Sequence, residues 1–490
     1  MNTELVTVEF LLNGIFHSVK VDTKMSTLNL LKEEFHLMGT KEGCGEGDCG
    51  ACTVALGSVN QDHMEFCAIA SCIYPAVKLH GKHLITIEGL GDHTRLHVIQ
   101  QHIINSYGVQ CGFCSPGIIM SFFALFAMNT HPSMAEVEIA LQGNICRCTG
   151  YEGIRKAGET LIKTFEADQS SALSEKLIPA YVFETMDELK RIQESQGGRG
   201  YHVPASLAEY RELTDADTSR ILISGGTDVE VQIKQRKIPK DASLIDISRI
   251  KELQSIEEQD GILHIGSQLS VAACARHPLV QKHLPTFAHV AHLMASTQIR
   301  NAATIAGNIA NASPIGDTTV FFLALDASIG ILRSDSGSVE QLPLRSFFID
   351  YRKTALKSGD LIVDIAVPLH TEENLTQSVH FEKTSRRKDV DIATVNSASV
   401  VYLKGTVIVK WDMAFGGVGP IPFAIENITE GKELPETFDE DLLKKIGDSL
   451  LTRCSTLDDV RGSGAYRDQL VKNHVIKHFI AHTNSMNQEV

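Results

Sequence analysis

Eight of the eleven cysteines in this chain form two spaced groups, and these groups constrain the fold more than any other feature. Cys44, Cys49 and Cys52 have C-x4-C-x2-C spacing in a glycine-rich segment, and Cys72 follows. Glycine permits the unusual backbone conformations needed to bring N–H groups close to the sulfurs of a cluster. The spacing is typical of a [2Fe–2S] site with four thiolates, whereas zinc favours paired C-x2-C knuckles. Cys67 could compete with Cys72, but we expect it to be a small buried residue.

The second group combines a C-x2-C pair with a distant C-x-C pair. Its members are Cys111 and Cys114, followed by Cys146 and Cys148. Taken alone, this pattern could hold zinc, but the tight C-x-C pair is better suited to a cluster with two irons. We expect both pairs at helix ends, where unpaired backbone N–H groups stabilise negative charge.

Composition indicates a globular protein of several domains. The 490 residues correspond to about three or four domains, and 43% hydrophobic with 21% charged residues excludes general disorder. A net charge of −15 argues against nucleic-acid binding. The N-terminus does not resemble a signal peptide, and the most apolar window, residues 117–128, is too short to span a membrane. We therefore expect a cytoplasmic protein whose cysteines are ligands or free thiols.

Periodicity and turn signals divide the chain into five stretches: residues 1–90, 91–166, 167–200, 201–372 and 373–490. The first begins with a hairpin that turns at Asn13-Gly14, followed by a helix with Ser26 as its N-cap. The second is predicted to be a helical bundle, with Leu96, Ile99 and Ile103 on one helix face. The third is a polar linker, and the last two contain both strands and helices.

Two further segments have the composition of a nucleotide site. An apolar strand at residues 221–223 runs into Ser224–Asp228, whose two glycines could form a turn that binds a pyrophosphate. Residues 298–308 and Asp317 combine small residues, which admit a flat ligand, with Asn and Asp groups for ribose or ring nitrogens. From composition alone, an ordinary turn and a buried capped helix remain alternatives. No G-x-G-x-x-G motif follows a strand.

The cysteine motifs GCGEGDCGACTV, QCGFCSPGIIM and GNICRCTGYEGI, in this order, resemble the iron–sulfur part of molybdenum hydroxylases of the xanthine dehydrogenase and aldehyde oxidase family. The resemblance implies a ferredoxin-like β-grasp domain over residues 1–90 and a helical-bundle [2Fe–2S] domain over residues 91–166. It assigns the first cluster to Cys44, Cys49, Cys52 and Cys72, and the second to Cys111, Cys114, Cys146 and Cys148. Cys274 and Cys454 match no ligand position and are expected to be structural.

The later segments resemble the flavoprotein part of the same family. This implies an α+β multidomain chain with a vanillyl-alcohol-oxidase-type (PCMH) FAD-binding domain over residues 201–372 and an α+β flavoprotein C-terminal domain over residues 373–490. The implied FAD contacts are Leu222, Ile223, Ser224, Gly225, Gly226, Thr227, Asp228, Val229, Thr304, Ile305, Ala306, Gly307, Asn308, Asp317, Ile392 and Lys410. Ala306 replaces a glycine of many relatives, and Met294 replaces an aromatic residue of some, which leaves the flavin-stacking residue open.

The family implies an electron-transfer subunit that receives electrons from a large subunit carrying the molybdenum cofactor. Two [2Fe–2S] clusters and FAD would pass them to NAD during hypoxanthine or xanthine oxidation. A heterodimer or a dimer of heterodimers is expected, because 490 residues leave no room for a molybdenum–pterin region. We assign no side chain as a catalytic acid or base. The twenty histidines show no cluster with metal-ligand spacing and are expected to be structural or on the surface.

Three alternatives remain from the sequence. The chain could serve an aldehyde or other N-heterocycle hydroxylase, act as a self-contained NADH–flavin reductase, or be a non-enzymatic iron–sulfur scaffold. The sequence leaves open the substrate, the choice of NAD or oxygen as acceptor, and the oligomeric state.

Overall fold

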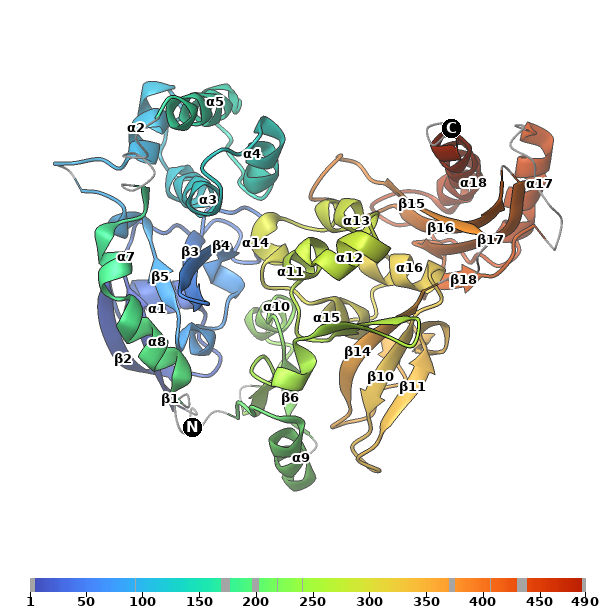
Figure 1. The fold of residues 1–490 in the computed structure, drawn as a ribbon, viewed down its shortest axis with the longest axis horizontal. Coiled ribbons are helices and arrows are strands. Elements are labelled where there is room, and N and C mark those ends of the chain that lie inside the picture. Colours follow the sequence, from blue (N-terminus) through green and yellow to red (C-terminus); the bar gives the residue numbers. More distant parts are fainter. Residues whose placement is uncertain are drawn as a thin grey trace. The chain divides into compact units, whose positions relative to one another are not determined.

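A computed structural model describes residues 5–92, 94–168, 177–195, 202–217, 219–239, 241–369, 375–405, 407–429 and 439–486 (Figure 1). The chain forms two compact units, each assembled from segments that are separate in the sequence. Unit 1 comprises residues 1–203, 220–248 and 295–303, and unit 2 comprises residues 204–219, 249–294 and 304–490. The stretch predicted to bind FAD is thus shared between the two units.

Unit 1 begins with a five-stranded sheet in the order β2-β1-β5-β3-β4. Its strands are β1 (Leu5–Leu12), β2 (Ile15–Asp22), β3 (Thr53–Asn60), β4 (His63–Ala70) and β5 (His83–Ile85). The predicted hairpin turn is present, with Asn13 and Gly14 at φ 50° and 85°. The predicted cap is present too, because the Ser26 hydroxyl accepts a hydrogen bond from the Asn29 N–H before helix α1 (Thr27–Glu33). These features confirm the expected β-grasp arrangement.

Four helices form the next part of unit 1, as predicted: α2 (Val98–Asn105), α3 (Ser115–Met128), α4 (Met134–Leu141) and α5 (Glu152–Glu166). Their core is aromatic, with the rings of Phe126 and Phe165 stacked 5.5 Å apart. The predicted face of α2 is wrong at one position. Ile99 and Ile103 are buried, but Leu96 is 42% exposed because the helix begins only after the N-cap His97.

The rest of unit 1 comes from later segments. Part of the predicted linker forms the short helices α7 (Ala180–Glu184) and α8 (Met186–Glu194), while residues 169–176 and 196–200 of it lie outside the described residues. The Tyr181 hydroxyl donates to the Gly89 carbonyl at 2.9 Å, so this segment packs on the first domain. The parallel strands β6 (Ile221–Ile223) and β7 (Leu244–Asp246), with helices α10 (Val229–Lys234) and α14 (Thr297–Arg300), complete the unit.

Unit 2 contains a five-stranded antiparallel sheet in the order β11-β10-β14-β9-β8. These strands are β8 (Ile256–Gln259), β9 (Ile262–Gly266), β10 (Ser328–Leu332), β11 (Val339–Pro343) and β14 (Leu361–Pro368), and a small ladder joins β12 (Phe348–Asp350) to β13 (Lys353–Thr354). The accompanying helices are α9 (Leu207–Ala216), α11 (Val271–Arg276), α12 (Pro278–His283), α13 (Phe287–Leu293), α15 (Ile305–Ala310) and α16 (Asp317–Ala324). Buried Phe287, Phe321 and Phe322 form its core.

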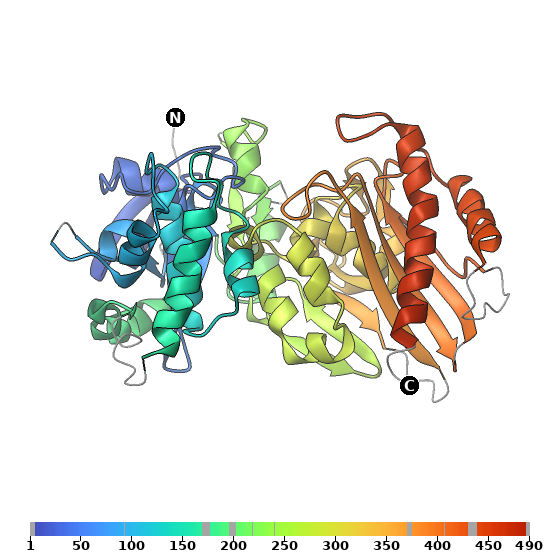
Figure 2. The same cartoon turned by 90° about the horizontal axis from the view of Figure 1, so that it is seen from above.

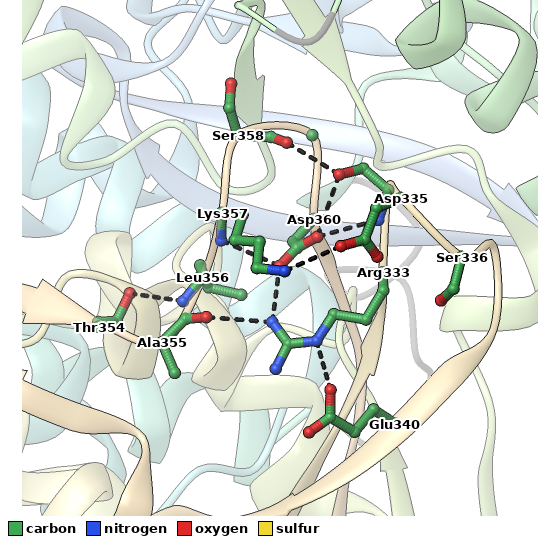
Figure 3. A network of polar contacts seen from close by, with 12 residues as sticks. Arg333, Asp335, Ser336, Glu340, Thr354, Ala355, Leu356, Lys357, Ser358 and Asp360 are labelled. Carbon is green, nitrogen blue, oxygen red and sulfur yellow. Dashed lines mark hydrogen bonds and ion pairs between the residues drawn. The ribbon is translucent and has the colours of Figure 1, made fainter.

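A polar network closes the loop end of β10 and β14 (Figure 3). The Arg333 guanidinium donates to the buried Asp360 carboxylate at 2.7 Å and to Glu340 at 2.6 Å. The same Asp360 carboxylate accepts the backbone N–H groups of Ser334 and Lys357, both at 2.9 Å. Each buried charge is therefore paired, which makes this network structural.

The final sheet of unit 2 has the order β15-β16-β17-β18 and is covered by the last helix (Figures 1 and 2). Its elements are β15 (Thr376–Thr384), β16 (Val395–Lys404), β17 (Val407–Gly416), β18 (Phe423–Ile425), α17 (Glu440–Leu451) and α18 (Gly464–Met486). Among the described residues, no helix is both long enough and apolar enough to cross a membrane.

Several histidines gather at the helix α18, although the sequence analysis, which considered only metal-ligand spacing, did not single them out. His474, His478 and His482 recur every fourth residue along α18, and all three are buried. The Ser397 hydroxyl hydrogen-bonds with His474 and His478 at 2.8 and 2.7 Å, and His478 meets His380 at 2.8 Å. Burial lowers the pKa of His474 and of His482 to about 3. These neutral rings join helix and sheet through hydroxyl partners, so their role is structural, as expected.

Candidate functional site

Three cysteines of the first group, Cys44, Cys49 and Cys52, lie in the loop between α1 and β3. The fourth, Cys72, follows β4. Cys52 and Cys72 are each 1% exposed, Cys49 is half-buried and Cys44 is exposed. Cys72 lies directly after β4, whose pairing with β3 brings it beside Cys52. The fold thus brings together the four predicted ligands, although the fourth is distant in sequence.

Backbone N–H groups in this loop point at the thiol sulfurs. The N–H groups of Glu46 and Asp48 donate to the Cys44 sulfur at 3.4 and 3.2 Å, and the Cys44 N–H donates to the Cys49 sulfur at 3.3 Å. Gly45 and Gly47 adopt φ 73° and 85°, the left-handed conformation that lets the loop turn inward. This is the environment that sequence analysis predicts for cluster thiolates.

The four thiols are close enough to hydrogen-bond with one another. Hydrogen bonds with Cys49 and then Cys72 hold the pKa of Cys44 well below its usual range, while the bond to Cys44 raises the pKa of Cys49. Hydrogen bonding with Cys44 and Cys52 likewise raises the pKa of Cys72. Four adjacent thiols with this donor chemistry fit the ligand set of a [2Fe–2S] cluster.

The second group lies between the helices of the bundle. Cys114 is the N-cap of α3, and Cys146 and Cys148 belong to the loop between α4 and α5. The Cys111 and Cys148 sulfurs are 3.6 Å apart and exposed, whereas Cys146 is buried and contacts the Thr149 hydroxyl at 3.1 Å. Burial, with a hydrogen bond to Cys146, raises the pKa of Cys114 to about 12.

Neither group is arranged for a single ion. Within the described parts of the chain, no three His, Cys, Asp or Glu side chains are gathered so that they could hold one metal ion. A binuclear cluster divides its four thiolates between two irons and therefore requires a wider arrangement.

The two cysteine loops are joined by two hydrogen bonds, one from a backbone N–H and one from a side-chain amide. The Ile145 N–H donates to the Cys49 carbonyl at 3.0 Å, and the Asn144 amide donates to the Gly50 carbonyl at 3.1 Å. Ile145 directly precedes Cys146, so one hydrogen bond connects a predicted ligand of the first cluster with the residue beside a ligand of the second.

The predicted pyrophosphate loop, Ser224–Asp228, belongs to unit 1 and lies against the segment after Cys72. Gly226 has φ 81°, and a Cβ atom there would come within 2.9 Å of Pro75. A Cβ atom at Gly225 would lie 2.1 Å from the Ala302 carbonyl oxygen. The Lys78 ammonium donates to the Ser224 carbonyl. The two glycines therefore let the loop pack closely against Ala302 and Pro75, and its contact with a pyrophosphate stays a prediction.

Helix α10 connects this loop with the first cysteine loop. Lys234, in its last turn, donates to the Gly45 carbonyl at 2.7 Å. Glu230 on the same helix is 1% exposed, its Oε1 has no partner within the described structure, and burial raises its pKa to about 8. Sequence analysis missed Lys78, Lys234 and Glu230 because no motif marks them.

The remaining predicted FAD residues belong to unit 2. Thr304 caps α15 by accepting the Gly307 N–H at 3.1 Å, and Asn308 accepts the Thr318 hydroxyl at 2.7 Å. Thr318 follows Asp317 at the start of α16, so the structure brings Thr304, Asn308 and Asp317 into neighbouring helices.

Asp317 has two partners that sequence analysis missed. The Lys383 ammonium, 3% exposed, donates to its carboxylate at 2.6 Å, and the Asn396 amide donates to it at 2.7 Å. Burial raises the pKa of Asp317, and the contacts with Lys383 and Asn396 oppose that rise. Asp317 is thus buried with two partners, Lys383 from β15 and Asn396 from β16.

The last two predicted contacts are less closely grouped. Ile392 is 50% exposed in the loop between β15 and β16. Lys410 pairs with Asp412 at 2.8 Å and lies 5.0 Å from the Tyr402 ring. Gly416 pairs with Asn396 and is six residues along β17 from Lys410, about 20 Å at roughly 3.3 Å per residue. The structure does not bring Lys410 to Asp317, and its contact with FAD stays a prediction.

Four family models match the chain in sequence order. They are the 2Fe-2S iron-sulfur cluster binding domain at residues 10–77, the [2Fe-2S] binding domain at 86–159, the FAD binding domain in molybdopterin dehydrogenase at 191–370, and the CO dehydrogenase flavoprotein C-terminal domain at 380–481. The chain therefore contains two [2Fe–2S]-binding domains and an FAD-binding domain.

Several xanthine dehydrogenases are similar over nearly the whole chain. The enzyme of Drosophila subobscura is 29% identical over 95% of this chain and 38% of its own length. The enzyme of Emericella nidulans is 30% identical over 86% of this chain and 34% of its own, and the Rattus norvegicus xanthine dehydrogenase/oxidase is 29% identical over 90% and 36%. The chain thus spans a little over a third of the length of these relatives.

Solved structures resemble a little over half of the chain. A carbon monoxide dehydrogenase from Hydrogenophaga pseudoflava, lacking the Mo-pyranopterin moiety of its cofactor, is 27% identical, with a TM-score of 0.51 over 56% of this chain and 93% of that chain. Quinoline 2-oxidoreductase from Pseudomonas putida 86, at 23% identity and a TM-score of 0.53, covers 58% and 97% and shares the fold. The chain is a homologue of the xanthine dehydrogenases and carries the iron–sulfur, FAD-binding and flavoprotein C-terminal domains of that molybdenum hydroxylase family.

Proposed function

We propose that this chain is the electron-transfer component of a xanthine dehydrogenase, which passes electrons from a molybdenum subunit through two [2Fe–2S] clusters to FAD and on to NAD. One observation carries the proposal: unit 1 holds the second cysteine group, the first cysteine group and the pyrophosphate loop in one connected series. The Ile145–Cys49 hydrogen bond makes the first connection. The Lys234–Gly45 and Lys78–Ser224 contacts make the second.

The cofactors would supply the redox chemistry, because clusters exchange single electrons and a flavin exchanges either one electron or a hydride. The chain's own residues hold and tune them. Cysteine sulfurs ligate the irons, the loop N–H groups of Glu46 and Asp48 stabilise negative charge on sulfur, and Lys78 and Lys234 fix the flavin loop beside the first cluster. No side chain is assigned as a general acid or base.

The surface near the second cysteine group supports a protein partner. Tyr107, Phe113, Ile145 and Tyr151 are 86%, 47%, 49% and 44% exposed. The Tyr151 hydroxyl accepts the Cys146 N–H at 2.9 Å, and Phe113 lies between Cys111 and Cys114, so this apolar surface surrounds the cluster site. Large exposed apolar side chains beside a functional site are candidates for a partner contact. In our proposal it contacts the molybdenum subunit, in a heterodimer or a dimer of heterodimers in the cytoplasm.

Two assays of the purified chain test this function. With clusters and FAD bound, the chain should reduce an artificial dye with NADH and lose that activity when FAD is removed. Without a molybdenum subunit it should not oxidise hypoxanthine, and adding that subunit should restore oxidation. Hypoxanthine turnover by a preparation shown to lack molybdenum would refute the division of labour.

The same assays separate the alternatives. A self-contained NADH–flavin reductase would reduce the dye, but no molybdenum subunit would restore substrate oxidation. In our proposal Cys114→Ala keeps the dye reduction and loses the substrate oxidation that the molybdenum subunit restores. A partner subunit that restores oxidation of aldehydes or another N-heterocycle, but not of purines, would change the substrate and keep the electron path. A chain that never binds FAD would favour the iron–sulfur scaffold.

A further inference from the structure

Gln298 is a buried residue of the flavoprotein region that contacts both iron–sulfur domains. It lies on α14 in unit 1 and is 1% exposed. Its amide nitrogen is 3.3 Å from the Thr53 hydroxyl, 3.1 Å from the Ser121 hydroxyl and 3.1 Å from the Asn144 side-chain carbonyl, and these three acceptors share its two N–H hydrogens. Three segments thus converge on one amide group.

The orientation of this amide is fixed by its partners. The Thr53 hydroxyl donates its hydrogen to the Gly50 carbonyl at 2.7 Å, and the Ser121 hydroxyl donates to Asn144 at 2.7 Å. Both hydroxyls therefore offer only lone pairs to Gln298, so the amide nitrogen and not the oxygen faces them. The opposite atom, Oε1, is buried and has no partner among the described residues. Such an arrangement is costly, so Gln298 is not a generic filler of the core.

The three acceptors all belong to segments that carry predicted cluster ligands. Thr53 directly follows Cys52, Asn144 lies two residues before Cys146, and Ser121 is on α3, the helix that Cys114 caps. The contact between the cysteine loops, from the Ile145 N–H to the Cys49 carbonyl, lies next to this network.

We infer that Gln298 is a positioning residue that sets the spacing and orientation of the two clusters. The inference rests on the proposed function, in which electrons pass between these clusters. Electron transfer between fixed centres falls steeply with their separation, so a residue that holds both ligand loops controls that step. Gln298 lies within the residues matched by the FAD-binding family model. Through its contacts, the folding of the flavoprotein region therefore affects the geometry of the clusters.

Other residues anchor the same segment independently. The Thr297 hydroxyl donates to the Ile139 carbonyl at 2.8 Å, and the Asn301 amide donates to the Ala68 carbonyl at 2.9 Å. The segment therefore stays attached when the Gln298 amide is removed, and the effect of Gln298 on the clusters can be measured separately.

The test is Gln298→Met in the full chain with both clusters present and reduced chemically. Methionine is of similar size and removes the donor. We expect unchanged iron content, a weaker and more heterogeneous magnetic interaction between the clusters in low-temperature EPR, and a shifted midpoint potential of at least one cluster. Thr297→Val is the matched control, since it removes the bonds of Thr297 to Ile139 and Arg300 and contacts none of the three acceptors of Gln298. It should keep the wild-type spectrum and potentials.

Wild-type spectra and potentials in Gln298→Met would overturn the inference, and so would equal changes in Thr297→Val. Should the methionine variant fail to fold, Ser121→Ala removes one acceptor with little change in volume, and it should alter the cluster interaction in the same direction but less. Because the clusters are reduced chemically, the outcome does not depend on NADH. A wild-type chain with two interacting clusters that takes no electrons from NADH would refute the proposed acceptor and leave the Gln298 comparison valid.

Discussion

The two cysteine sites have the same ligand chemistry but differ in how far their ligands are exposed. In the first, Cys52 and Cys72 are each 1% exposed, and residues distant in the sequence, such as Lys234, contact the loop. In the second, Cys111 and Cys148 are exposed. Only Cys44 is exposed in the first site, and only Cys146 is buried in the second. The first site is thus the more enclosed of the two, whereas the second presents two exposed thiols.

The glycines of the two loops show the same contrast. Gly50 and Gly150 both have left-handed backbone, at φ 67° and 63°. A Cβ atom at Gly50 would lie 2.3 Å from the Gly143 carbonyl oxygen, whereas one at Gly150 would have no described atom within 4 Å. The first loop has no room for an added atom at Gly50, whereas the second has room at Gly150. This is the expected design when one cluster serves the interior of the chain and the other a partner.

Loss of one ligand should give the largest effect and tests whether the two sites are independent. Cys49→Ala and Cys114→Ala should each remove one cluster, because a [2Fe–2S] centre needs four ligands. Iron analysis should fall by about half, and EPR of the reduced protein should show a single remaining centre, a different one in each variant. Cys67→Ala should keep both. Two intact centres in Cys49→Ala would refute the ligand assignment of the first site.

A smaller effect is expected from adding one methyl group to each loop. Gly50→Ala and Gly150→Ala share the cost of left-handed backbone, roughly 1–2 kcal/mol. Only Gly50→Ala adds a collision with the Gly143 carbonyl. We expect a lower melting temperature and a disturbed first-cluster EPR signal in Gly50→Ala, with both cluster signals preserved in Gly150→Ala. Equal effects would mean that enclosure does not distinguish the sites.

Much of the fold could be predicted from short-range patterns. The Asn13-Gly14 turn and the Ser26 cap depend on neighbouring residues alone, and both are present in the structure. Cysteine spacing indicated the two groups because the ligand loops are local, and the fold brings each group together. Leu96 was wrongly predicted to lie on the buried face of α2, because the apolar spacing continues on the N-terminal side of the first helical residue.

The missed residues act over long sequence separations. Lys383 and Asp317 come from different elements, and Gln298 contacts segments far earlier in the chain. The sequence around a single lysine or glutamine does not show whether its side chain is on the surface or makes such a long-range contact. The histidines of α18 do have a visible pattern in the sequence, a spacing of four residues. Their role could not be predicted, because it depends on buried hydroxyl groups of the sheet that bond to them.

The last prediction concerns the order in which the clusters lose iron. A chelator must reach the metal or wait for the loop to open, and the cost of opening grows with the contacts that enclose it. The second site has two exposed ligands, Cys111 and Cys148, whereas the first has one, Cys44. Cys52 and Cys72 can be reached only after the packing around β3 and β4 loosens. On mild chelation under reducing conditions, the second-cluster EPR signal should therefore disappear before the first, and the order should hold across chelators of different size. Binding of the molybdenum subunit over Tyr107 and Phe113 should slow loss of the second cluster and leave the first unchanged. Protection of the first cluster instead would mean that the partner binds elsewhere, and that the open site is not the electron entry.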